Sequence, residues 1–290
     1  MALPTTDTIV TYPDGATTSS GVVLHVEELS GSRSAVLLDT TAFHPVDTAW
    51  PDQPADRGVL VTASTEHLIV DGLTGGIHEG VLYLGADLPV RNGTEGWIFV
   101  VAHIIEGSGP AVGTAADVSV DAQYRTSLSA GHTACHLASL ALDAALADAW
   151  TKQVPTDALG NPAFDALAIA TSRIHPNSSV DVYRLGKSLR RKGFTVAALD
   201  DLGAIERRAN SLLEEWRSGG GAIRIERDAH ELSARRTWVC ELGGGRTDIP
   251  CGGTHLHNLD ELSGVTISLE TEDLEGARQL TMTTSARLAQ

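Results

Sequence analysis

The stretch HTACHLASLALDAALADAW, at residues 132–150, decides the fold of the second half of the chain. Ala and Leu dominate it, and both have high intrinsic helix propensity. Apolar residues occur around much of the helix circumference, so we expect a buried helix rather than one on the surface. The turn sequence LGNP at 159–162 is expected to end this helical region.

Two histidines of this helix, His132 and His136, are four positions apart. Residues with this spacing lie on one helix face, about 5–6 Å apart at Cβ, so both imidazoles can reach one metal ion. The alternative is a pair of hydrogen-bonded core histidines. Thr133 stands where the His-Glu-x-x-His motif of metalloproteases has its Glu, so we exclude a metalloprotease of that kind.

A second half-site, CGGTH at residues 251–255, follows the tripeptide DIP at 248–250. Cys251 and His255 can point at one centre, because Gly252 and Gly253 permit backbone conformations closed to other residues. Thiolate and imidazole are ligands of zinc, and the ligand spacing is not that of a zinc finger. We therefore predict a single Zn²⁺ site with four ligands, namely His132, His136, Cys251 and His255.

Residues 1–118 have the pattern of a β-rich domain. Many short strands separated by close turns are typical of a small barrel or a sandwich, and we expect a small barrel-like domain. The segment PVDTAWPDQPAD at 45–56 is rich in Pro and Asp, which predicts a loop. The strands are expected in the apolar runs GVVLHVEEL (21–29), SAVLLDT (34–40), GVLVTA (58–63), EHLIVDGL (66–73), GVLYLG (80–85) and GWIFVVAHII (96–105).

Residues 119–290 are expected to form an α+β domain, so the chain as a whole belongs to the α+β class. A second helix is predicted at 199–219, capped by Asp200 or Asp201 and stopped by the glycines that follow. Residues 163–170 fit a strand or a helix equally. A basic segment ends at Gly193, and further strands are expected at 222–228, 237–242, 264–273 and 277–286.

Composition indicates a globular protein in a reducing compartment. The 290 residues are 42% hydrophobic and 20% charged. No apolar run is long enough for a transmembrane helix, and the first residues do not resemble a signal peptide. Three cysteines are too few for a disulfide framework. We therefore expect a cytoplasmic protein that does not bind membranes.

The distribution of charge limits where a nucleic acid could bind. The net charge is −16, and residues 1–120 contain 3 basic against 15 acidic residues. Such a surface repels phosphates, so a nucleic-acid contact is expected only in the second half. The window 184–236 has 12 basic and 8 acidic residues, and its alternative interpretation is a solvated helical region.

Several segments together resemble the editing domains of alanyl-tRNA synthetases and the free-standing trans-editing proteins of the AlaX type. GHTACHLASLAL (131–142) and DIPCGGTHLHNLDELSGVTI (248–267) resemble the two metal motifs of that family. The similarity covers about residues 35–285 and includes VLLDTTAFHP (36–45), DQPADRG (52–58), VSVDAQYRTSLSAGHTACH (118–136) and ERRANSLLEEW (206–216).

The resemblance implies an ATP-independent, zinc-dependent deacylase that hydrolyses the ester of mischarged Ser-tRNA(Ala) or Gly-tRNA(Ala). It also implies a buried zinc-bearing helix packed against an antiparallel sheet. The chain has no synthetase domain, so the enzyme would act in trans on the acceptor end of tRNA, and no DNA partner is expected. Thr41 matches the threonine that senses the serine hydroxyl, and Gln53 matches the glutamine of a glycine-rich motif. The remaining expected contacts are Gly252, Gly253 and Thr254 for the substrate and Arg184, Lys187, Arg190, Arg191 and Lys192 for tRNA.

Two departures from the family pattern lie at the expected substrate pocket. The loop PVDTAWPDQP at 45–54 replaces a glycine-rich loop, and His44 stands where the family has a tyrosine. The sequence therefore leaves two alternatives open: hydrolysis of another aminoacyl-tRNA or small ester, and a non-catalytic tRNA-binding module with structural zinc. Oligomeric state is open as well.

The ligand count constrains the mechanism. Zinc can polarise a carbonyl or lower the pKa of bound water to about 7, but four protein ligands are typical of a closed structural site. Either Cys251 gives way to water, or the coordination number rises, or zinc only anchors the substrate. The expected catalytic group is a zinc-bound water, and no protein base is assigned. His257 and Asp248 are near in sequence, and a structural role fits each equally.

Overall fold

The computed structural model describes residues 2–63, 65–243, 245–274 and 277–289, and it mixes helices with β-sheets. The chain divides into two compact units. The first unit comprises Met1–Thr126, Ile225–Thr237 and Pro250–Thr254; the second comprises Ser127–Arg224, Trp238–Ile249 and His255–Gln290. The expected domain boundary at 118/119 stays a prediction. Within the described ranges, no helix combines the length and the apolar character needed to cross a membrane.

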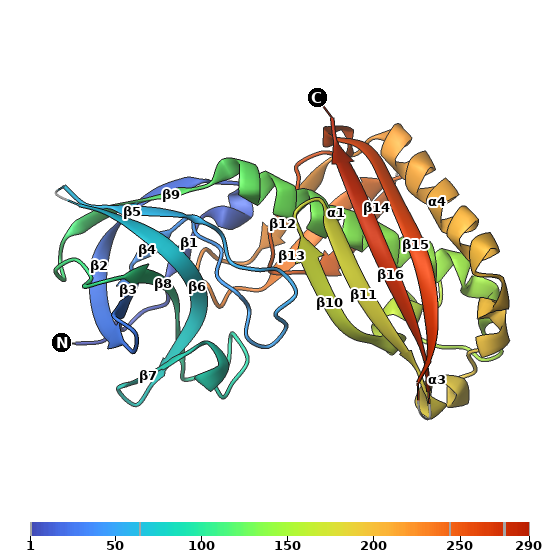
Figure 1. The fold of residues 1–290 in the computed structure, drawn as a ribbon, viewed down its shortest axis with the longest axis horizontal. Helices are drawn as coiled ribbons and strands as arrows, with labels where there is room; N and C mark the ends of the chain where they lie inside the picture. Colours follow the sequence, from blue (N-terminus) through green and yellow to red (C-terminus); the bar gives the residue numbers. More distant parts are fainter. Residues whose placement is uncertain (1, 64, 244, 275–276, 290) are drawn as a thin grey trace. The chain divides into compact units, whose positions relative to one another are not determined.

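A seven-stranded antiparallel sheet dominates the first unit (Figure 1). Its order is β5-β9-β2-β3-β8-β6-β7, and β5 also pairs with β6, so the pairings of six strands close into a ring. Each of the six predicted apolar runs overlaps one strand of this sheet, whereas its seventh strand, β9, was not predicted. The strands are β2 (Thr18–Leu29), β3 (Arg33–Leu38), β5 (Gly58–Val61), β6 (Glu66–His78), β7 (Val81–Leu84), β8 (Ile98–Glu106) and β9 (Ala115–Val120).

Alternating side chains of these strands form the core of the first unit. In β9, for example, every second residue is buried, as expected when one face of a strand covers a core. A main cluster gathers apolar residues from six strands, including Val23, Val36, Leu60, Ile69 and Val118. This burial fixes the register of the strands, because a slip by one residue would turn the apolar set outward.

A distant segment of the chain completes the first unit. The short strands β1 (Ile9–Val10) and β4 (Thr40–Thr41) pair in parallel. The backbone N–H of Val10 donates to the carbonyl of His230, at 2.9 Å, and that of Leu232 donates to Thr8, also at 2.9 Å. These backbone bonds explain why Ile225–Thr237 belongs with the N-terminal residues.

The second unit contains a four-stranded antiparallel sheet of order β10-β11-β16-β15. Helix α4 (Leu202–Gly219) packs on this sheet, because the Asn210 side chain exchanges two hydrogen bonds with the backbone of Ile267. The Asp201 side chain caps α4 by accepting from the N–H of Ala204, which confirms the prediction. The sheet strands are β10 (Ile169–His175), β11 (Ser178–Leu185), β15 (Leu262–Leu274) and β16 (Ala277–Leu288).

Helix α1 (Ala122–Ala145) differs at both ends from the predicted range 132–150. It begins earlier because the Asp121 side chain accepts from the N–H of Tyr124, which is the geometry of an N-cap. Past its end, Ala147–Ala149 form a separate 3-10 turn. The ambiguous stretch 163–170 contains both structures, because α2 (Phe164–Ala168) leads directly into β10.

Three further strands and two short helical segments lie in the second half of the chain. The strands β12 (Ile223–Arg227), β13 (Arg236–Leu242) and β14 (Gly245–Pro250) form a three-stranded sheet in that order. The predicted strands at 222–228 and 237–242 correspond to β12 and β13, whereas β14 was not predicted. The basic segment before Gly193 forms α3 (Lys187–Arg191), and a 3-10 turn spans Val196–Asp201.

Buried carboxyls of the second unit give a testable pH dependence. Asp143 accepts a hydrogen bond from the N–H of Asp165 at 2.7 Å, and Asp165 accepts one from the Tyr183 hydroxyl at 2.9 Å. Burial raises the pKa of Asp143 from 3.8 to about 8 and that of Asp165 to about 6. The folded state therefore holds protons that the unfolded state loses near pH 4, so stability falls as pH rises toward 8.

We expect Asp143→Asn to flatten this dependence, because the amide keeps the acceptor oxygen and carries no charge. The variant should unfold at higher urea than the wild type at pH 8, with the difference growing by about 1 kcal/mol per pH unit between pH 5 and 8. Urea unfolding across that range measures it. Glu270→Gln, at an exposed position of β15, is the control. Parallel curves for Asp143→Asn and the wild type would contradict the expectation.

Candidate metal centre

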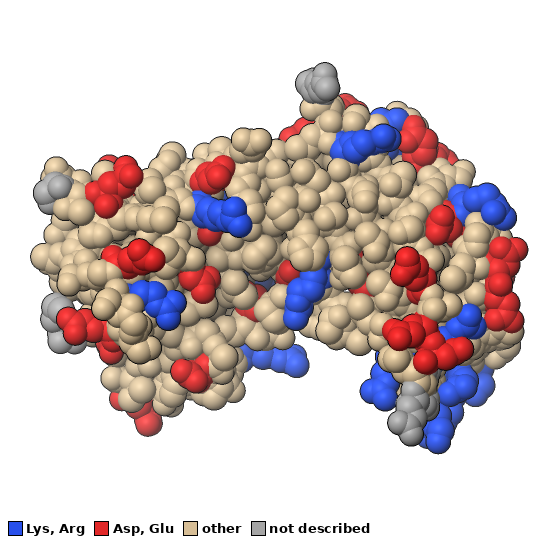
Figure 2. All heavy atoms as spheres, viewed as in Figure 1, with Lys and Arg blue, Asp and Glu red and all other residues tan. Residues whose placement is uncertain are grey.

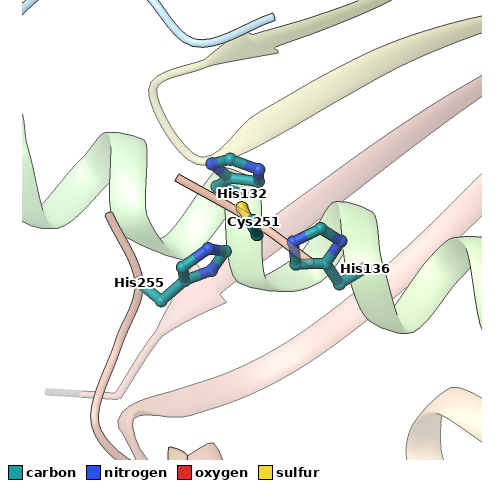
Figure 3. A group of neighbouring side chains, drawn as sticks. All are labelled: His132, His136, Cys251 and His255. Atoms are coloured by element: carbon teal, nitrogen blue, oxygen red, sulfur yellow. The ribbon is translucent and has the colours of Figure 1, made fainter. Parts of the chain in front are cut away.

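The four predicted ligands form one group (Figure 3). Each of His132, His136, Cys251 and His255 offers one ligand atom, and these atoms all lie within 4.8 Å of one another. The ring centroid of His132 is 4.9 Å from that of His136 and 4.4 Å from that of His255. The spacing argument therefore identified residues that the fold does bring together, and the group can hold a metal ion.

The chemistry of the group fits a metal ion. The Nε2 atom of His136 is buried and has no hydrogen-bond partner among the residues that the structure describes, which is costly unless another group satisfies it. Burial lowers the pKa of His132 to about 3 and that of His136 well below its ordinary value, so both rings are neutral near pH 7. Neutral imidazole is the form that binds metals. The Trp238 ring lies 5.0 Å from His136 and closes one side with an apolar surface.

Without a bound cation, the Cys251 side chain is expected to be a neutral thiol near pH 7. Burial raises the pKa of the Cys251 thiol to about 12. A metal binds the thiolate and not the thiol, so loading the group with a divalent ion releases this proton. Metal affinity should consequently increase with pH.

Thr133 holds the ring of His255 in place. Its hydroxyl oxygen lies 3.4 Å from Nδ1 of His255 and accepts a hydrogen bond of 3.1 Å from the N–H of Leu256. Thr133 is fully buried on α1, one residue after His132. Groups that orient metal-binding imidazoles in this way are a regular part of metal sites. Sequence reasoning used Thr133 only to exclude a metalloprotease, because nothing local links it to residues 255 and 256.

The turn that carries Cys251 is held by hydrogen bonds within the first unit. The N–H of Cys251 donates to the carbonyl of Arg236 at 3.1 Å, and the N–H of Gly253 donates to the Cys251 sulfur at 3.4 Å. Gly252 is not in the left-handed region, and a Cβ there would meet only Arg236, at an ordinary contact distance. The expectation that Gly252 supplies a special backbone conformation is therefore wrong.

Gln53 and Thr254, two predicted substrate contacts, bind each other. The Gln53 amide nitrogen donates to the Thr254 hydroxyl at 2.9 Å, and the N–H of Thr254 donates to the Gln53 amide oxygen at 3.1 Å. Both side chains are buried. The structure thus places Gln53 beside the turn that carries Cys251, in contact with protein. Substrate contact by Gln53, Gly252, Gly253 and Thr254 stays a prediction.

Thr41 lies in the interior of the first unit. Its hydroxyl is 2.9 Å from Nε2 of His103, and it accepts from the N–H of Phe43 at 3.1 Å. Nδ1 of His103 lies 3.0 Å from the carbonyl of Val36, so Nδ1 carries the proton and Nε2 accepts from Thr41. Burial lowers the pKa of His103 to about 4, which keeps the ring neutral. The hydroxyl proton of Thr41 is therefore committed to His103.

A buried ion pair joins the segments on either side of the loop at 45–54. Arg125 donates from Nε to Asp56 at 2.7 Å and also pairs with Asp56 through Nη2. The same guanidinium donates to the carbonyl of Ala42 at 2.8 Å, and the N–H of His44 donates to Asp56 at 2.6 Å. Arg125 thereby holds residues 42 and 56, on either side of the loop, in place relative to each other.

The predicted tRNA contacts form one exposed basic cluster on the second unit. They lie at the end of β11 and on α3, where buried Leu189 anchors the short helix. Figure 2 shows Lys and Arg side chains gathered around the position of α3. We call this set the α3 cluster; its members, all exposed, are Arg184, Lys187, Arg190, Arg191 and Lys192.

Arg236 is a residue near the group that sequence reasoning missed. Its side chain is buried, and Nη2 donates to the carbonyls of Glu231 and Leu232. Nε is buried and has no hydrogen-bond partner within the described part of the chain, and the guanidinium lies 5.4 Å from the Tyr12 ring centroid. Its charge opposes the effect of burial on the pKa of Cys251. A lone arginine outside any motif gives no sequence signal for such a position.

His257 and Asp248 have structural contacts and are both exposed. The N–H of His257 donates to Glu261, which forms a capping box with Asn258. The Asp248 carboxylate lies 3.6 Å from Nη2 of Arg246. These contacts favour the structural alternative for both residues.

Searches of protein-family models and of curated proteins give no match to this chain. The functional argument therefore depends on the residues and their geometry.

Thr41 gives a stability prediction that is independent of function. Thr41→Val should lower the free energy of unfolding by about 1–3 kcal/mol, because it leaves buried Nε2 of His103 without its donor. Thr41→Ser keeps the hydroxyl and should recover most of this loss. Urea unfolding at pH 7 measures both, and equal stability of Thr41→Val and Thr41→Ser would show that the His103 contact contributes nothing.

Proposed function

We propose that this protein is a zinc-dependent aminoacyl-tRNA deacylase that acts in trans on mischarged tRNA(Ala), with Ser-tRNA(Ala) or Gly-tRNA(Ala) as substrate. The observation that supports it most is the group of three imidazoles and one thiol, assembled from two distant motifs. These are the same two motifs that resemble the alanyl-tRNA editing family.

The proposal extends to the domains. We infer that the ring of six strands is the small barrel of an N-terminal domain, and that α1 is the zinc-bearing helix of the editing domain. Two contacts support the packing of α1 on an antiparallel sheet. The Cys135 sulfur lies 3.5 Å from Asp181 of β11, and a Cβ at Gly131 would collide with the backbone of His175 and Ser178.

The donor set favours zinc. Imidazole nitrogens and a thiolate form a common tetrahedral zinc set, whereas magnesium and calcium prefer oxygen. When bound, zinc would supply Lewis acidity, either by polarising the ester carbonyl or by lowering the pKa of water. The chain itself contributes neutral imidazoles, a thiol that loses its proton on metal binding, and Thr133 to orient His255.

The α3 cluster is the proposed contact for the tRNA acceptor end. Its five exposed cations can pair with successive phosphates, while the acidic first 120 residues disfavour binding elsewhere. Lys152 adds a sixth cation to this neighbourhood, because its Nζ donates to the carbonyl of Arg191 at 3.0 Å. The cytoplasm, where charged tRNA is used, is the proposed location.

Release of the amino acid from Ser-, Gly-, Thr- and Ala-tRNA(Ala), with and without prior chelation, tests the activity. We expect release from Ser- or Gly-tRNA(Ala) that chelation abolishes, while Ala-tRNA(Ala) is spared. His132→Ala and His255→Ala should abolish release, because each removes a ligand. His175→Ala, at an exposed histidine of the same unit, should have wild-type activity.

The other outcomes separate the alternatives. Release of a different amino acid would mean that the substrate is another aminoacyl-tRNA. Residues 45–58 would then be the segment to test as the source of the changed specificity. Stoichiometric zinc and tight tRNA binding without release would indicate a non-catalytic module. Undiminished release by metal-free His132→Ala would refute the zinc mechanism.

The α3 cluster is tested by reversing two charges. Arg190→Glu combined with Arg191→Glu should raise KM for tRNA at least tenfold and leave kcat little changed. The slope of log KM against log salt should fall by the amount expected for the loss of about two phosphate contacts. Arg33→Glu, on an exposed arginine of the first unit, is the matched control. Identical KM values for the double variant and the wild type would place the tRNA contact elsewhere.

A further inference from the structure

The amide of Gln53 and the residue Thr254 form a closed pair of hydrogen bonds across 201 positions of sequence. One bond runs from the amide nitrogen to the hydroxyl and the other from the backbone N–H to the amide oxygen. Gln53 is 1% exposed and Thr254 is 3% exposed. Both bonds are thus shielded from competing water, and their opposite donor directions fix the orientation of the amide.

The pair lies at one end of the metal-binding turn. Thr254 directly precedes the ligand His255, and at the other end the ligand Cys251 is fixed by the carbonyl of Arg236. Gly252 and Gly253 stand between these points and have no side chains with which to restrain the turn. Glycine gains the most backbone freedom when unrestrained, so this turn depends on supports from outside it.

Gln53 is itself held firmly enough to act as such a support. Its N–H donates to the side chain of Asp52 at 2.7 Å. Three residues further on, Asp56 is buried in the ion pair with Arg125 and accepts from the N–H of His44. The loop at 45–54, which contains Gln53, is therefore held in place by the buried contacts of Asp56.

From this geometry we infer that Gln53 is a positioning residue for the metal-binding turn, and that it sets the metal affinity of the site by holding Thr254. This assigns to Gln53 a role other than the substrate contact that its motif suggests. The inference depends on the metal group and not on the deacylase reaction. The inference also assigns a role to residues 45–58, because this segment supports the metal-binding turn through Gln53.

Zinc affinity, measured by competition with a chromogenic chelator, tests the inference without any activity assay. Gln53→Leu and Thr254→Val should each weaken zinc binding by about tenfold, the scale of losses when contacts behind metal ligands are removed. The double variant should bind zinc no more weakly than Gln53→Leu alone, because Gln53→Leu already removes both bonds and Thr254→Val removes one of the same two.

Cobalt(II) provides a spectroscopic measure of the turn itself. Cobalt bound to a thiolate has a charge-transfer band in the near ultraviolet, which reports on the bond to Cys251. In Gln53→Leu we expect this band to weaken or shift. A loss of global stability alone would not change the band of the molecules that remain folded.

Thr8→Val is the matched control, because Thr8 is equally buried in the first unit and uses its hydroxyl twice. It donates to the carbonyl of Leu38 at 3.3 Å and accepts from the N–H of Val101 at 3.1 Å. This variant should lose stability while zinc affinity and the cobalt spectrum stay as in the wild type. Should Gln53→Leu fail to fold, Thr254→Val alone makes the same test.

The possible failures are distinguishable. Wild-type zinc affinity and an unchanged cobalt spectrum in Gln53→Leu and Thr254→Val would overturn this inference and leave the deacylase proposal standing. A wild-type protein that binds zinc but releases no amino acid would count against the deacylase alone. A wild-type protein that binds no zinc would overturn both.

Discussion

The convergence of three histidine rings in the interior of the protein is the constraint on which the structure around them depends. Burial lowers the pKa of His132 and His136, and no residue in the described ranges forms a hydrogen bond with Nε2 of His136. A folded protein rarely retains such an arrangement unless something compensates for it. A metal ion compensates for it directly, because it uses the nitrogen lone pairs that the interior leaves unsatisfied.

The surroundings of the group support it at several levels. Thr133 orients His255 from α1, and Arg236 and Gln53 fix the two ends of the turn that carries Cys251. Behind Gln53, the pair of Arg125 and Asp56 closes the loop at its base. Each support joins segments that are distant in sequence, so a substitution in the loop can alter the metal site without touching a ligand.

The contrast between local and distant relations explains how much the sequence alone could predict. The ligand pairs could be predicted, because i and i+4 on a helix and a short Gly-rich turn are local geometries. The cap of α4 at Asp201 was predictable for the same reason. The start of α1 was missed because residues 122–131 contain Ser, Thr and Gly, which weaken the helix signal. The partners of Thr41, Gln53 and Arg236 lie far along the chain, and no local pattern indicates them.

The order of the ligands along the chain has a consequence for how the protein is made. His132 and His136 are synthesised first, and Cys251 follows His136 by 115 positions. The proposed donor set is therefore complete only once residue 255 has been added to the growing chain. A chain truncated before residue 251 would contain only two of the four donors, so the proposed four-ligand site could not form in it.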